Sequence, residues 1–108
     1  SPLRRLCRWY QLQCDGDWEH DFGVSLSTLD NPGWRVKINL TETSLELRAF
    51  DSLKIERSPD NWIHADIRTD QGRTIWSAAG GPGNLEEMIT LFVDWADCWS
   101  TNQKAQGT

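Results

Sequence analysis

The densest group of chemically active side chains in this sequence lies in residues 15–20, which read DGDWEH and are named here the acidic loop. Asp17 with Glu19, or Glu19 with His20, has the residue types of an acid–base pair. The same side chains, with His64, could hold a metal for hydrolysis. No distant nucleophile or oxyanion-stabilising feature accompanies them, and their spacing does not fit a calcium-binding EF-hand loop. We therefore predict no enzyme activity, no metal and no cofactor, with a small metal-dependent hydrolase as the alternative.

Partner binding explains the acidic loop better than catalysis does. Its three carboxylates would steer a basic partner by charge, and Trp18 would anchor that partner through its large apolar surface. A plainer interpretation is a solvated connection between a helix and a strand, with Trp18 buried in the core. The candidate contact residues of the loop are Asp15, Asp17, Trp18, Glu19 and His20.

Three further stretches hold polar and aromatic residues. Residues 28–34 contain a turn built on proline and glycine, and we add Asn31 and Trp34 from it as candidate contacts. Trp62 and His64 lie on the polar side of a predicted strand and complete the candidate set, although a lone histidine there is typical of an ordinary exposed residue. Residues 80–84 are glycine-rich, but no P-loop lysine follows them, so they indicate a turn and a helix cap.

Length and composition limit the fold size and the kinds of partner that this protein can have. A chain of 108 residues suits one domain, and its net charge of −5 disfavours nucleic acid and favours a basic partner. Seven tryptophans exceed average usage, and surplus tryptophans are often found at interfaces.

The cysteines and the apolar stretches indicate the compartment. Three cysteines without CxxC spacing indicate reduced thiols, and we expect Cys7 and Cys14 to be buried. No apolar stretch approaches the ~20 residues of a membrane span, and the first residues lack the pattern of a signal peptide, so we expect an intracellular protein.

Helical periodicity occurs at both ends of the chain. The spacing predicts a helix over residues 2–14, ended by Gly16, with an apolar face of Leu3, Leu6, Cys7, Tyr10 and Cys14. A second helix is predicted from residue 85, with Asn84 as its N-cap and an apolar face of Leu85, Met88, Ile89, Phe92, Val93, Ala96 and Trp99. We predict a single domain over residues 1–100 and a disordered tail over 101–108.

Alternating apolar and polar residues fill the region between the two helices. They predict strands over residues 22–28, 34–40, 53–57, 62–68 and 73–76, the first two joined as a hairpin. The predicted fold class is α+β: an N-terminal helix, an antiparallel meander sheet of about five strands and a C-terminal helix. Both helices would cover one sheet face and leave the other face open.

Several of these motifs together resemble one known family. They are Trp9-Tyr10, residues 13–20, residues 28–34, Gly80-Gly81-Pro82 and residues 84–87. Over roughly residues 6–95 the chain resembles the immunity protein 53 family. The resemblance implies a bacterial cytoplasmic protein that binds and neutralises a polymorphic toxin encoded beside it. Our hypothesis for the mechanism is that the acidic loop with Trp18 covers the toxin's active surface. The acidic charge makes a basic, nuclease-type toxin our hypothesis for the partner, without nucleic acid or membrane. An oligomeric structural or regulatory protein stays open as another alternative.

Overall fold

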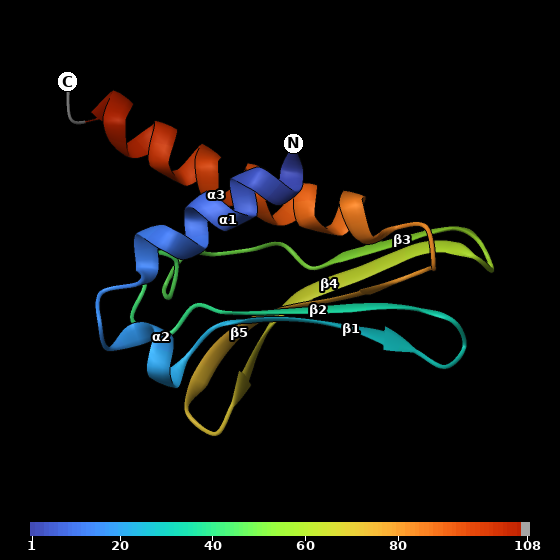
Figure 1. Ribbon diagram of the computed structural model, residues 1–108. Helices are drawn as coiled ribbons and strands as arrows, with labels where there is room; N and C mark the ends of the chain where they lie inside the picture. Colours follow the sequence, from blue (N-terminus) through green and yellow to red (C-terminus); the bar gives the residue numbers. More distant parts are fainter. Residues whose placement is uncertain (107–108) are drawn as a thin grey trace.

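The computed structural model describes residues 1–106, with side chains for residues 1–97. Within that part of the chain two long helices lie on one face of a five-stranded antiparallel sheet (Figure 1), which confirms the predicted α+β class. The elements are α1 (Pro2–Gln13), α2 (Trp18–Asp21), β1 (Val24–Leu29), β2 (Gly33–Asn39), β3 (Leu53–Ser58), β4 (Asn61–Asp70), β5 (Arg73–Gly80) and α3 (Leu85–Gln106). The single-turn helix α2 was not predicted.

The strands follow the order β1-β2-β5-β4-β3, so the predicted simple meander is wrong in its order. β5 lies between β2 and β4, and its centre, from Trp76 to Ala78, is buried as a central position requires. The segment that joins β2 to β3 therefore crosses to the far edge of the sheet. Leu40 and Leu45 hold this segment in the core, at 0% and 1% exposure.

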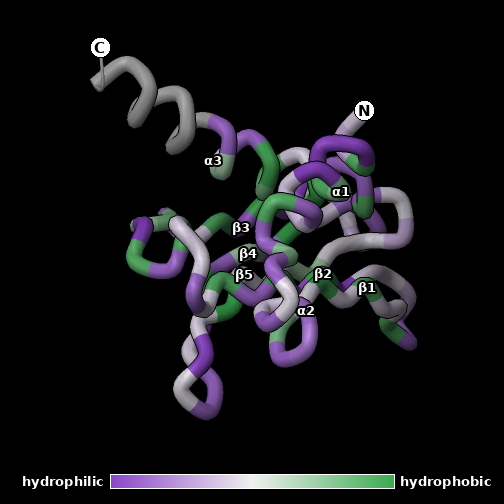
Figure 2. Tube along the Cα trace, turned by 60° about the vertical axis from the view of Figure 1, so that its left-hand side comes forward, coloured by the Kyte–Doolittle hydropathy of each residue, from purple (hydrophilic) through white to green (hydrophobic). Residues whose placement is uncertain are grey.

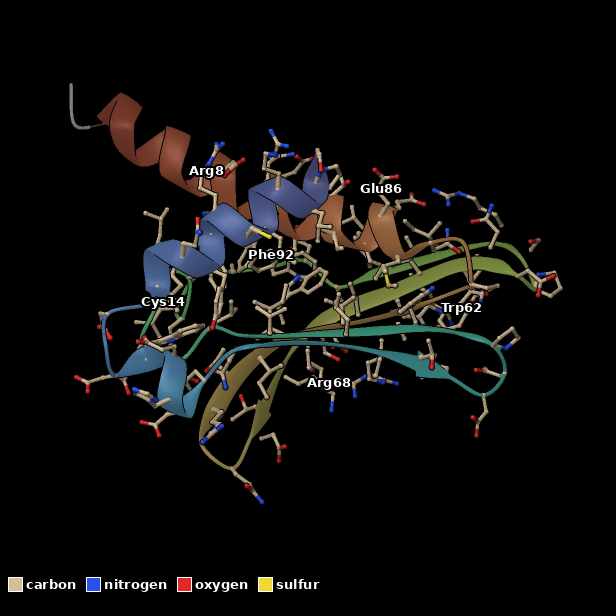
Figure 3. The ribbon with its side chains drawn as sticks, in the orientation of Figure 1. Arg8, Cys14, Trp62, Arg68, Glu86 and Phe92 are labelled. Carbon is tan, nitrogen blue, oxygen red and sulfur yellow. The ribbon has the colours of Figure 1, made fainter. Side chains whose placement is uncertain are left out.

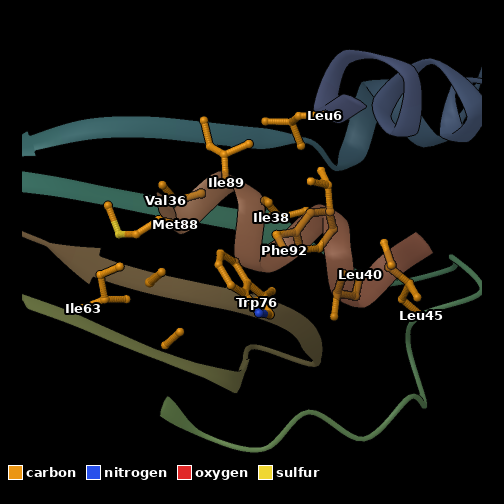
Figure 4. Close-up of a cluster of buried hydrophobic side chains, with 14 residues drawn as sticks. Leu6, Val36, Ile38, Leu40, Leu45, Ile63, Trp76, Met88, Ile89 and Phe92 are labelled. Carbon is orange, nitrogen blue, oxygen red and sulfur yellow. The ribbon is translucent and has the colours of Figure 1, made fainter. Parts of the chain in front are cut away.

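The core lies between the helices and the sheet (Figure 4). Its largest fully buried side chains are Trp76, Phe92, Ile38, Leu40, Leu45, Ile63, Met88, Val36 and Val93. Burial of each such side chain contributes on the order of 1.5–3 kcal/mol. Hydropathy follows this arrangement, because the turn between β4 and β5, which lies away from α1 and α3, is hydrophilic (Figure 2).

Helix α1 is confirmed, but its predicted apolar face is wrong. Leu6 is buried and Trp9 packs against the core, whereas Cys7 and Cys14 are exposed and Leu3 is 56% exposed. Arg5 explains the rotation, since its guanidinium binds Asp94 at 2.9 Å and Asp97 at 2.5 Å on α3. These ion pairs turn the Arg5 side of α1 toward α3 and leave part of the apolar stripe in solvent.

Helix α3 begins where the sequence predicts, directly after Asn84, whose carbonyl accepts a hydrogen bond from the Met88 N–H at 3.0 Å. Its backbone is described to Gln106. The side chain of Trp99 and those of the predicted tail 101–108 lie outside the described residues, so the tail stays a prediction. Among the described helices none has the length and apolar character that a bilayer span requires.

Candidate functional site

Asp15 and Glu19 are structural residues of the acidic loop. One oxygen of Asp15 accepts the backbone N–H groups of Asp17 and Trp18, both at 2.9 Å. The Glu19 carboxylate accepts those of Asp15 at 2.9 Å and Gly16 at 2.8 Å. Gly16 has φ +97°, a left-handed conformation that glycine adopts without strain. These bonds fold the loop and start α2.

Trp18 lies in the core, as the plainer interpretation of the acidic loop predicts. The expectation that Trp18 is an exposed anchor for a partner is therefore wrong. Its side chain is 4% exposed, and its indole Nε1 donates a hydrogen bond to the Thr41 carbonyl at 2.9 Å. The rings of Trp9, Tyr10 and Phe22 surround it at centroid distances of 6.0–6.1 Å. Only the charged groups of the acidic loop are left as candidate contacts, and of these Asp17 and His20 are exposed and not used by the fold.

The carboxylates of the acidic loop give a testable pH dependence. Backbone N–H groups, that of Trp18 first, hold the pKa of Asp15 below its ordinary value, and those of Glu19 itself, Asp15 and Gly16 do the same for the pKa of Glu19. A lowered folded pKa stabilises the fold above the unfolded pKa, and this stability is lost as pH falls.

We therefore expect Asp15→Asn and Glu19→Gln to melt at a lower temperature than the parent protein at pH 7. The difference should begin to shrink below about pH 4, where the carboxylates of the unfolded parent chain take up protons, and should vanish once those of the folded parent are protonated too. Asp17→Asn is the matched control, since Asp17 makes no such bond. A melting difference that stays constant from pH 7 to pH 3 would contradict the assignment.

The open face of the sheet gathers three of the other candidates. Cross-strand pairing places Trp62, His64, Asp66 and Arg68 on the face opposite the buried side chains of β4. Figure 3 shows Arg68 on the side of the sheet away from the helices and Phe92 between helix and sheet. A hollow of about 320 Å³, named here the open-face hollow, is lined by Leu29, Asn31, Arg35, Trp62, His64, Asp66, Arg68, Ser77 and Ala79.

Trp62 differs from the other tryptophans whose side chains are described. Trp18 and Trp76 are buried, and Trp9, Trp34 and Trp95 pack against the core. Trp62 is half-buried, contacts the His64 ring at 5.1 Å, and its indole N–H meets no acceptor within the described residues. An indole with a free donor on an open sheet face is suited to binding a partner.

The candidate set is therefore divided between two surfaces. Cys14, which precedes the acidic loop, and Trp62 lie toward opposite ends of the sheet in Figure 3. Trp34 belongs to neither surface, because it packs on the helix side and donates its indole N–H to the Pro82 carbonyl at 3.1 Å. The candidate residues therefore do not form one continuous surface.

The open face of the sheet carries more positive charge than the chain as a whole, whose net charge is −5. Arg68 binds Asp66 at 3.0 Å, and His64 binds Glu56 at 3.0 Å, a hydrogen bond that lowers the pKa of Glu56. Arg35 and Lys37 of β2 have no ion pair within the described residues. The sequence reasoning missed both, although their positions between the buried residues of β2 are the signal that puts them on this face.

The glycine-rich turn positions Trp62. Gly81 donates its N–H to the Trp62 carbonyl at 3.1 Å, and the Asn84 side chain accepts the Trp62 N–H at 3.3 Å. A Cβ on Gly81 would meet the Asp60 carbonyl at a distance that real structures do not show, whereas one on Gly83 would meet nothing within 4 Å.

We expect Gly81→Ala to cost about 1–3 kcal/mol of folding stability, because the new methyl group forces the two turns apart. Gly83→Ala is the matched control and should stay within about 0.5 kcal/mol. Urea unfolding of both variants measures this. Equal stability of the two variants would show that the contact at Gly81 is not tight.

Neither surface forms a metal site. Within the described part of the chain, no three His, Cys, Asp or Glu side chains come together as metal ligands would. Asp17, Glu19 and His20 are thus not grouped as a metal-ligand set in this part of the chain, and the metal-dependent hydrolase stays an alternative to be tested.

Comparison with protein families identifies a match. A family model described as Immunity protein 53 matches residues 3–97. The match takes in nearly all of α1, the whole sheet and both candidate surfaces. Searches of the curated proteins and of the solved structures found no match.

Proposed function

The chain belongs to the immunity protein 53 family, and from that premise we propose that it binds and neutralises the toxin domain encoded beside its gene. Family membership gives the immunity role. The proposal adds direct binding to the toxin without catalysis, with the open-face hollow as the main contact surface. Bound there, the chain would cover the active surface of the toxin.

One observation carries the choice of surface, namely Trp62 on the open face. Interfaces gain most of their affinity from a few aromatic or arginine side chains in partly enclosed settings. Trp62 and Arg35 both line the open-face hollow, and the indole N–H has no acceptor of its own among the described residues. Asn31 and His64, which line the same hollow, would supply hydrogen bonds around this anchor.

The acidic loop has a second, weaker part in the proposal. Asp17 and His20 are exposed, and the net charge of −5 attracts a basic, nuclease-type toxin domain from a distance. Asp15 and Glu19 keep their charge while they fold the loop. We propose that the loop speeds the approach of the toxin, because exposed charges act mainly on the association rate.

The proposal is tested by mixing the purified chain with the toxin domain encoded by the neighbouring gene. We expect a one-to-one complex by calorimetry, loss of toxin activity at equimolar chain, and survival of cells that express both proteins. Asn31→Ala and His64→Ala should weaken the complex, whereas Leu47→Ala, at a residue that is 96% exposed on the β2–β3 connection, should leave it unchanged. The proposal fails if the proteins do not bind at micromolar concentration and co-expression gives no protection.

The rival enzyme has its own test. Calorimetric titration with zinc, manganese and calcium should show no stoichiometric binding to the parent protein. Tight binding that Asp17→Asn abolishes would favour the hydrolase instead.

A further inference from the structure

Strand β1 is an edge of the sheet with free backbone groups. The Gly23 carbonyl accepts the Asn39 N–H at 3.0 Å, and bonded pairs alternate along an antiparallel ladder. Val24, Leu26 and Thr28 consequently form the unbonded pairs with β2. Their N–H and C=O groups point away from the sheet, where another strand could bind them.

The two edges of the sheet differ in their protection. β3, the opposite edge, carries Lys54, Glu56 and Arg57 and has a bulge between Glu56 and Ser58. Charges and bulges of this kind block unwanted strand pairing. The six residues of β1 read VSLSTL and contain no charge and no proline. The edge at β1 is thus left open to a partner strand.

An apolar groove runs beside this edge. It has a volume of about 400 Å³ and is lined by Leu6, Cys7, Tyr10, Phe22, Gly23 and Val24. Tyr10 and Leu26 are 37% and 41% exposed. Since the side chains of Val24 and Leu26 lie on the helix side of the sheet, a strand added at β1 would direct alternate side chains into the groove beneath α1. Cys7 and Tyr10 of α1, which the core leaves out, would then be buried.

Charges beside this edge select its occupant. Lys37 and Arg35 of β2 pair with Ser25 and Ser27 of β1, on the face of the sheet opposite the groove, and have no ion pair within the described residues. A second copy of this chain would bring the same two cations against them. A segment that carries carboxylates would be attracted instead.

We propose that an extended segment of the toxin adds to β1 as a further strand of the sheet, with apolar side chains in the groove and carboxylates on the other face, beside Arg35 and Lys37. This inference rests on the proposed function and extends its contact surface from the open face to the adjoining edge. Main-chain hydrogen bonds along β1 would supply affinity, and the groove would supply specificity.

Amide hydrogen exchange, resolved by NMR, tests the proposal on the unmodified chain. In the free protein the outward amides of Val24, Leu26 and Thr28 should exchange fast, while those of Ser25 and Ser27, bonded to β2, should be protected. With the toxin domain bound, we expect at least about a hundredfold slowing at the three outward amides alone.

The outcomes separate this inference from the proposed function. If the toxin binds but the outward amides still exchange fast, the added strand is wrong and toxin binding stands. If the toxin does not bind, both are wrong. If the outward amides are already protected in a free protein that light scattering shows to be a dimer, a second copy occupies the edge and the inference is overturned.

A matched pair of variants gives an independent readout. Leu26→Pro removes one outward N–H and no ladder bond, and Leu26→Ala removes the side chain but keeps the N–H. We expect the proline variant to bind the toxin at least about tenfold more weakly than the alanine variant. Equal affinities, with both variants folded by circular dichroism, would contradict the added strand.

Discussion

Trp18→Ala should destabilise the fold more than any other single change considered for this chain. Trp18 is 4% exposed, and its indole Nε1 binds the Thr41 carbonyl. Removing a buried tryptophan costs about 3–5 kcal/mol, through lost contacts and a residual cavity. In a domain of this size the melting temperature should fall by at least about 12 °C.

Two controls separate burial from a contact role at this position. Trp18→Phe keeps most of the apolar volume and should lose much less stability. Leu12→Ala removes a side chain that is 76% exposed on the neighbouring helix α1 and should melt like the parent protein. If Trp18→Ala melted like the parent and bound the toxin weakly, Trp18 would be the exposed anchor after all, and the burial described above would be wrong.

Trp62→Ala should have the largest effect on toxin binding. Loss of an aromatic anchor costs roughly 2 kcal/mol or more of affinity, which is about a thirtyfold increase in the dissociation constant. The change should appear mainly in the dissociation rate. Melting temperature should change little, because Trp62 lies outside the apolar cluster of the core.

A second variant at position 62 shows whether an aromatic ring is what matters there. Trp62→Phe retains an aromatic face and should recover part of the affinity. Asp17→Asn tests the acidic loop separately, and it should alter the association rate and the salt dependence of that rate. Surface plasmon resonance at two salt concentrations resolves both rates. Unchanged dissociation for Trp62→Ala would remove the open-face hollow from the interface.

Most secondary structure could be predicted from the sequence because the two periodicities are local. Alternation of Trp34, Val36 and Ile38 identified β2, and helical spacing identified α3. The strand order could not be predicted, since the choice of β5 as the neighbour of β2 depends on burial summed over the whole sheet. The rotation of α1 was missed because Arg5 finds its partners on α3, 92 residues away in the case of Asp97.

The candidate site was predicted only in part. Trp18 and Trp62 both stand among charged residues in the sequence, so composition around them does not tell core from surface. Alternation did place Trp62 on the polar side of its strand. What the sequence could not show is that Asn31, in a turn far along the chain, lines the same hollow as Trp62. That closeness follows from the β2–β5–β4 pairing.

The most direct test of toxin binding at the open face is the indole N–H signal of Trp62 in an NMR titration with the toxin domain. The N–H groups of Trp18, Trp34 and Trp95 already donate to carbonyls within the fold, so their signals serve as internal controls. The account predicts that the Trp62 signal shifts or broadens at one equivalent of toxin while the signal of Trp18 stays in place. A saturated complex in which the Trp62 signal does not move would contradict it.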